Sequence, residues 1–180
     1  LARLCGIEPD QGLYGVLFAL TAVSLALSAR YLRTMAGLSS AARHIALVLL
    51  AAVLLFVPGP DFGQREHWMI LLFVPWLLLR LARSDGWTPP VAEAVVVGAA
   101  AAAAVCLKPH SVLAPMLVEV LLLYRTRNWR HALAAENLAA VAFVLLYGAA
   151  ILIWARPFLD GVLQLGMQLP GLSRLGLLPR

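Results

Sequence analysis

A length of 180 residues is enough for one domain, yet 62% of the residues are hydrophobic and only 13% are charged. Soluble domains carry a charge on about a quarter of their residues, so this composition and a mean hydropathy of +0.87 exclude an ordinary water-soluble protein. The net charge of +5 does not indicate nucleic-acid binding, because most of the arginines lie in short loops and form no patch interleaved with exposed aromatic residues. We therefore expect a protein embedded in the lipid bilayer, with no nucleic-acid partner.

Six apolar segments follow one another along the chain. Each is continuous rather than alternating, which favours helices over a β-barrel. The predicted fold is all-α: a polytopic integral membrane bundle of about six transmembrane helices, forming a single transmembrane domain over residues 1–180. Because the chain begins at Leu1 without a methionine and stops directly after Arg180, we expect it to be part of a longer protein and a larger bundle. The six segments are Leu13 to Ala29, His44 to Val57, Trp68 to Leu79, Val91 to Leu107, Val112 to Tyr124 and Asn137 to Ala155.

The basic residues predict how these segments are oriented. Cytoplasmic loops carry an excess of Arg and Lys, and the loops at residues 30–43, 80–90 and 125–136 are the arginine-rich ones. Residues 58–67 and 108–111 then share the opposite, extracytoplasmic edge of a bacterial inner (plasma) membrane. The basic residues of the three loops are Arg30, Arg33, Arg43, Arg80, Arg83, Arg125, Arg127 and Arg130.

The stretch from residue 58 to 67 is unusually rich in ionisable side chains, with Asp61, Arg65, Glu66 and His67 between two apolar segments. A carboxylate such as Asp61 or Glu66 is a candidate general base at the edge of a helix bundle. The alternative is structural: Asp61 caps a turn, while Arg65 and Glu66 form a solvated ion pair.

Lys108 is the only lysine in the chain and ends the fourth apolar segment. An ammonium group at this depth is suited to bind a phosphate, and His110 could donate to the same oxyanion. The alternative is that Lys108 only extends its ammonium group to the interface. Glu119 lies inside the fifth segment, where an ionised group is costly, and we expect it to be the structural partner of an arginine.

Two runs resemble known membrane enzymes. Leu107-Lys-Pro-His110, an apolar segment and the run Leu121-Leu-Leu-Tyr-Arg-Thr-Arg-Asn-Trp-Arg130 resemble the Leu-Lys-Pro element, apolar helix and Arg-rich turn of polytopic glycosyltransferases of the GT-C superfamily. Phe62-Gly-Gln-Arg-Glu-His67 is also similar to a motif in bacterial membrane proteins of that type. The resemblance covers roughly residues 58–131.

This resemblance implies an enzyme that transfers a sugar, with inversion, from a polyprenyl-phosphate donor to an extracytoplasmic acceptor. A carboxylate of an outer loop acts as base or binds a divalent metal ion in such enzymes. The acidic motif of the family lies in the first outer loop, and Glu8 with Asp10 is a poor version of it, so the base could also precede Leu1. Carried over to this chain, the resemblance implies Lys108 as the phosphate contact and Asp61 or Glu66 as the catalytic carboxylate. From their place beside these residues, we also expect Gln64, Arg65, His67 and His110 to bind substrate.

Two other functions are compatible with the sequence. A transporter or lipid flippase subunit predicts ionisable residues deep in several helices. A noncatalytic scaffold subunit of a cell-envelope complex predicts that the outer polar clusters contact protein partners, whose identity the sequence does not indicate.

Overall fold

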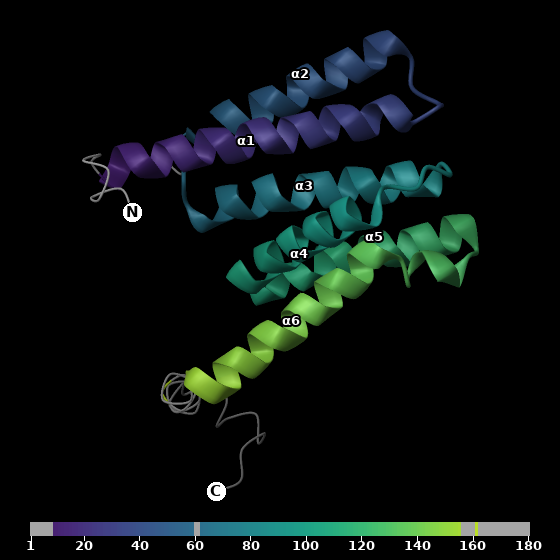
Figure 1. The fold of residues 1–180 in the computed structure, drawn as a ribbon. Coiled ribbons are helices and arrows are strands. Elements are labelled where there is room, and N and C mark those ends of the chain that lie inside the picture. The colour runs from purple at the N-terminus through teal and green to yellow at the C-terminus, as the bar shows by residue number, and fades with distance from the viewer. Residues whose placement is uncertain (1–8, 60–61, 156–160, 162–180) are drawn as a thin grey trace, which may run out of the picture. The chain divides into compact units, whose positions relative to one another are not determined.

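A computed structural model of the chain describes residues 9–59, 62–155 and 161. Within these residues the regular structure is entirely helical, which confirms the all-α expectation (Figure 1). The helices are α1 (Pro9–Thr34), α2 (Ser40–Phe56), α3 (Arg65–Ser84), α4 (Val91–Leu107), the 3₁₀ helix η3 (Pro109–Val112), α5 (Leu113–Thr126), the 3₁₀ helix η4 (Trp129–His131) and α6 (Ala135–Trp154).

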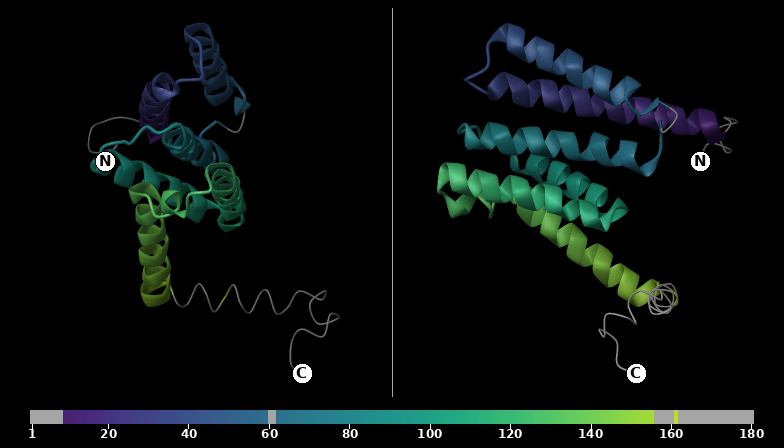
Figure 2. Two further views of the ribbon diagram at one scale, coloured as in Figure 1. Left: turned by 90° about the vertical axis from the view of Figure 1, so that its right-hand side faces the viewer. Right: turned by 180° about the vertical axis from the view of Figure 1, so that it is seen from behind.

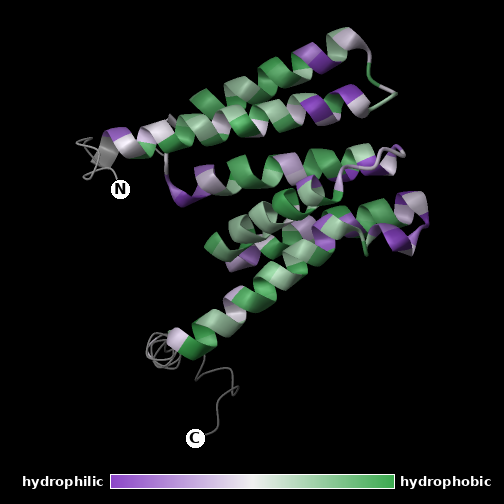
Figure 3. Cartoon of the chain, viewed as in Figure 1, coloured by the Kyte–Doolittle hydropathy of each residue, from purple (hydrophilic) through white to green (hydrophobic). Residues whose placement is uncertain are grey.

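Three of these helices are long and apolar enough to cross a membrane: α1, α3 and α6. Figure 3 shows the same pattern, with hydrophobic residues along the helices and hydrophilic residues gathered near several helix ends. This composition is typical of an integral membrane protein. The helices α2 and α4 are apolar but have 17 residues each, and α5 has 14, so six membrane crossings stay a prediction.

The chain divides into two compact units, residues 1–143 and residues 144–180, with the boundary inside α6. In the first unit, α1 packs against α2 and α3, and α3 packs against α4 (Figure 2). The described part of the second unit is mainly the last turns of α6. Since the predicted site residues all precede residue 143, the first unit carries the site.

Two apolar clusters hold the first unit together. The larger lies between α1, α3 and α4 and contains Tyr31, Trp76, Leu79 and Val97. The smaller lies where α1, α2 and α3 meet, around Leu17, Leu54 and Leu71. Many large apolar side chains on the other helix faces are exposed, as expected for surfaces that contact lipid.

The alanine-rich helix α4 approaches a neighbouring helix closely. Ala94, Ala101, Ala102 and Ala104 are buried, and a Cβ atom added to Gly98 would lie 2.0 Å from the carbonyl oxygen of Glu136. No side chain larger than hydrogen fits there without a backbone shift. The first turn of α6 is therefore held directly against α4.

Ion pairs show that the loops sort into two ends of the first unit. Arg30 Nη2 lies 3.0 Å from Glu93 Oε2 and joins the end of α1 to the start of α4. Arg83 Nε lies 2.7 Å from Glu136 Oε1 and joins the end of α3 to the start of α6. We name this the arginine-rich end, because it holds the loops at residues 30–43, 80–90 and 125–136. Their predicted grouping is confirmed, and their cytoplasmic location stays a prediction.

The segment boundaries need one correction. The apolar pattern predicts that the third segment begins at Trp68, but Arg65, Glu66 and His67 already form the first turn of α3. Most of the other helices also extend a few residues beyond their apolar segments, because backbone hydrogen bonds continue to form where the polar side chains begin.

Candidate functional site

The described residues of the connection between α2 and α3 are held by several contacts. Gly59 and Gly63 have φ values of 47° and 87°, a region that is accessible to glycine at little cost. The Trp68 indole nitrogen donates to the Gly63 carbonyl over 3.1 Å. The Phe62 ring packs 5.7 Å from that of Phe18 on α1. These contacts bring the start of α3 to the end of α2.

His67 is buried in this connection, with 2% of its surface exposed. Its Nδ1 accepts the Gly63 N–H over 3.2 Å, and its Nε2 lies 3.0 Å from the Leu54 carbonyl oxygen. Because Nδ1 accepts, Nε2 must carry the proton and donate to Leu54. Both ring nitrogens are thus bonded to the backbone. These contacts give His67 a structural role, and its assignment to substrate binding stays a prediction.

The first turn of α3 presents the polar side chains next to His67. Gln64 is the N-cap residue of α3, and Arg65 and Glu66 follow it; all three are exposed. A carboxylate in the first turn is favoured by the helix dipole, which explains Glu66 at this position.

Lys108 is held at the other half of the site by the end of α4. Its backbone N–H donates to the Val105 carbonyl oxygen over 3.1 Å, which closes the last turn. Its own carbonyl oxygen accepts from the Ser111 N–H at 2.9 Å and from the Ser111 hydroxyl at 2.6 Å. The backbone of Lys108 is therefore fixed at the point from which its side chain extends.

The ammonium group of Lys108 contacts the carboxylate of Glu66. This ion pair brings the start of α3 and the end of α4 together at one end of the first unit, which we name the Lys108 end. Glu66 is 48% exposed and Lys108 26% exposed, so a ligand can reach both groups. His110 is exposed in η3, and Asp61 lies outside the described residues.

A second group of charges lies at the arginine-rich end and is almost completely enclosed. Arg80 donates from Nε and Nη2 to the two carboxylate oxygens of Glu119, over 2.6 and 2.8 Å. It donates from Nη1 to Glu136 over 2.7 Å, and Arg83 holds both carboxylate oxygens of Glu136. We name these four residues the buried charge cluster. The predicted role of Glu119 as the partner of an arginine is confirmed.

Sequence reasoning missed Arg80 and Glu136 as members of this cluster. Arg80 is 1% exposed and Glu136 is not exposed at all. A signal was present, because an arginine follows an apolar run directly and a glutamate precedes one. Arg80 enters the sequence argument only as a basic residue of a loop, and Glu136 does not enter it.

The described residues contain no group of three or more His, Cys, Asp or Glu side chains that could hold a metal ion. The divalent ion implied by the resemblance therefore has no fitting set of ligands within that part of the chain. In comparisons with known proteins, the chain matches no family model, no curated protein and no solved structure.

Proposed function

We propose that this chain is a membrane glycosyltransferase, or part of one, that transfers a sugar from a polyprenyl-phosphate donor to an extracytoplasmic acceptor. The observation that supports this proposal most is the contact between Glu66 and Lys108, which are 42 residues apart in sequence. It brings a carboxylate and the only lysine of the chain together, accessible, at one end of an apolar bundle. Both belong to the runs that resemble GT-C enzymes.

Side chains at the Lys108 end would bind the donor phosphate in the proposed reaction. The ammonium group of Lys108 and the guanidinium group of Arg65 would bind the phosphate and stabilise the charge that it gains as it leaves. His110 and Gln64 would add hydrogen bonds to the sugar or the phosphate. Glu66 would keep the lysine side chain pointed at this position before the donor binds.

The transfer itself needs one base. A carboxylate, Asp61 or Glu66, would take the proton of the acceptor hydroxyl while its oxygen forms a bond to the anomeric carbon. The bond from that carbon to the phosphate oxygen would break, and the polyprenyl phosphate would leave with the electron pair. Attack from the side opposite the phosphate would invert the anomeric centre. These steps use side chains alone.

The test is transfer of a labelled sugar from a polyprenyl-phosphate donor by the purified protein in lipid vesicles. We expect Lys108→Ala and Asp61→Asn each to lower the rate by about a hundredfold, the effect of removing one charge-stabilising or proton-transferring group. Arg130→Gln is the control, because it removes one charge from an exposed position at the arginine-rich end. Full activity in both Lys108→Ala and Asp61→Asn would contradict the assignment of these residues.

Exchanging the charges of Glu66 and Lys108 tests whether their ion pair is needed for donor binding or only for the structure. In the double variant Glu66→Lys with Lys108→Glu the ion pair can form again with its polarity reversed. A purely structural pair would recover the original rate. We expect transfer to stay low, because a phosphate held at position 108 would then face a carboxylate.

A further inference from the structure

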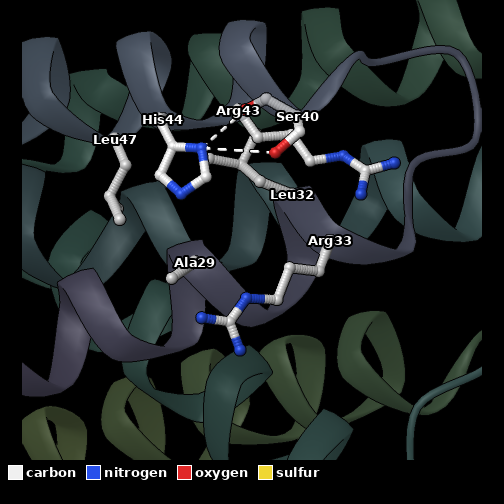
Figure 4. A pocket seen from close by; sticks show the side chains of 7 residues that line it. All are labelled: Ala29, Leu32, Arg33, Ser40, Arg43, His44 and Leu47. Carbon is white, nitrogen blue, oxygen red and sulfur yellow. Dashed lines mark hydrogen bonds between the residues drawn. The ribbon is translucent and has the colours of Figure 1, made fainter.

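A pocket of about 190 Å³ lies between the end of α1 and the start of α2 (Figure 4). It belongs to the arginine-rich end and is separate from the Lys108 end, because α2 runs between the two. A helix of 17 residues is about 25 Å long at 1.5 Å per residue, which sets their separation. The pocket is lined by Ala29, Leu32, Arg33, Ser40, Arg43, His44 and Leu47.

The side chains that line the pocket are either positively charged or uncharged. Arg33 and Arg43 contribute two positive charges, and no acidic residue lines the pocket. Among the described residues, no carboxylate forms an ion pair with either arginine, whereas Arg30, a few residues away on α1, is paired with Glu93. The pocket therefore carries a positive charge that the described part of the chain leaves uncompensated.

Several donors of the pocket are held in place by the backbone. Arg43 donates from Nη2 to the Met35 carbonyl oxygen over 2.9 Å, and its Nε atom is buried with no hydrogen-bond partner among the described residues. His44 Nδ1 lies 2.7 Å from the Ser40 carbonyl oxygen, so this nitrogen donates. In Figure 4 the other ring nitrogen of His44 points toward α1, which carries Ala29 and Arg33.

The start of α2 adds to this charge. The N-terminus of a helix carries a partial positive charge and unpaired N–H groups, and α2 has no acidic residue in its first turn. The pocket also lies where apolar helices end at the arginine-rich end, the depth at which lipid headgroups meet a membrane protein. A buried donor without a partner, two arginines without carboxylates and a helix start all favour the same kind of ligand.

We infer that the pocket between α1 and α2 binds a phosphate group. The source of this group is either an anionic lipid headgroup at the membrane edge or phosphate in solution, since both present the same oxygens. Binding there would neutralise Arg33 and Arg43 and hold the hairpin of α1 and α2 closed. This role is independent of the sugar transfer proposed for the Lys108 end.

The experiment measures the thermal unfolding midpoint of the whole chain in a neutral detergent while phosphatidylglycerol, phosphatidylcholine or inorganic phosphate is added. We expect phosphatidylglycerol to raise the midpoint with saturation, and phosphatidylcholine, which has no net charge, to have much less effect. An equal rise with inorganic phosphate would identify the soluble ion as a sufficient ligand. A rise with phosphatidylglycerol alone would identify the lipid headgroup.

The matched variants are Arg33→Gln in the pocket and Arg130→Gln outside it. Both side chains are exposed, so both proteins should fold, and each loses one positive charge at the same end. We expect Arg33→Gln to weaken binding of phosphatidylglycerol about tenfold, the usual effect of losing one charge-assisted hydrogen bond. Arg130→Gln should leave it unchanged. Equal weakening in the two variants, or equal effects of the two lipids without any effect of inorganic phosphate, would overturn the inference.

Discussion

Two groups of ion pairs in the first unit, the buried charge cluster and the pair of Glu66 and Lys108, differ mainly in burial. The buried charge cluster joins two arginines to two glutamates through bidentate contacts, and its central members Arg80 and Glu136 are at most 1% exposed. The pair of Glu66 and Lys108 consists of one contact between side chains that are 48% and 26% exposed. The members of the buried charge cluster are thus enclosed by their partners, whereas a ligand can reach Glu66 and Lys108.

This difference in burial bears on the hypothesis that the protein is a transporter or flippase subunit. That hypothesis expects ionisable groups deep in several helices, and the buried charge cluster does link α3, α5 and α6. Its arginines and glutamates neutralise each other, however, and Arg80 also donates to the His131 carbonyl oxygen over 3.0 Å. Such a closed network favours a clamp between helices over a path for ions.

The largest expected effect comes from removing one charge of the buried cluster. Glu136→Gln would leave Arg80 and Arg83 short of one negative charge at a position where Arg80 and residue 136 are both buried. We expect the free energy of unfolding to fall by about 4 kcal/mol, as is typical when one partner of a buried ion pair is lost. Reversible unfolding in mixed micelles measures it.

Asp85→Asn is the control for this prediction. Asp85 lies at the same end and its carboxylate is 3.8 Å from Arg125, but water reaches both side chains, which are 31% and 67% exposed. We expect a change of about 0.5 kcal/mol or less, as for other exposed pairs. Equal losses in the two variants would mean that burial does not distinguish these charges.

The second effect in size concerns the helix contact that encloses Glu136. Gly98→Ala places a methyl group where the Glu136 carbonyl oxygen lies 2.0 Å away, so α4 and α6 must separate. We expect a loss of about 2 kcal/mol in unfolding free energy, typical of overpacking. Gly15→Ala is the matched control, because a methyl group there meets nothing within 4 Å. It should be neutral or stabilising by about 0.5 kcal/mol, since alanine favours a helix more than glycine.

A similar prediction separates structural from accessible histidines. His67→Leu removes the donor to the Leu54 carbonyl oxygen and the acceptor of the Gly63 N–H, which leaves two backbone groups without their partners. We expect a loss of about 2 kcal/mol in unfolding free energy. His110→Leu changes an exposed side chain and should cost about 0.5 kcal/mol or less. A His67 variant as stable as the His110 variant would contradict the structural role of His67.

The sequence predicted the helices and the sorting of their loops because both follow from local features. Long apolar runs form helices in lipid, and short loops rich in arginine share one side. The meeting of the stretch at residues 58–67 with Lys108 followed from that sorting. It required only an even number of helices between the two stretches, and no knowledge of packing.

Partner choice could not be predicted in the same way. Arg80 contacts Glu119 and Glu136, which are 39 and 56 residues away, and nothing local distinguishes these partners from other acidic residues. The burial of His67 depends on the Leu54 carbonyl oxygen, which becomes accessible to a donor only because α2 ends there. Such contacts depend on the rotation of each helix about its axis and on the angles at which helices cross. The pattern of apolar and polar residues along the chain does not determine either.

The smallest effect on stability is expected at the Lys108 end. Lys108→Met removes the contact with Glu66. Because water reaches both partners of this pair in the native protein, the loss should be small and the unfolding midpoint should stay within the error of the measurement. The same variant should lose sugar transfer if Lys108 binds the donor phosphate. Measuring both quantities on one preparation separates the two roles. If the midpoint fell as far as it does in Glu136→Gln, the pair would be part of the framework, and a lost activity could no longer be attributed to phosphate binding.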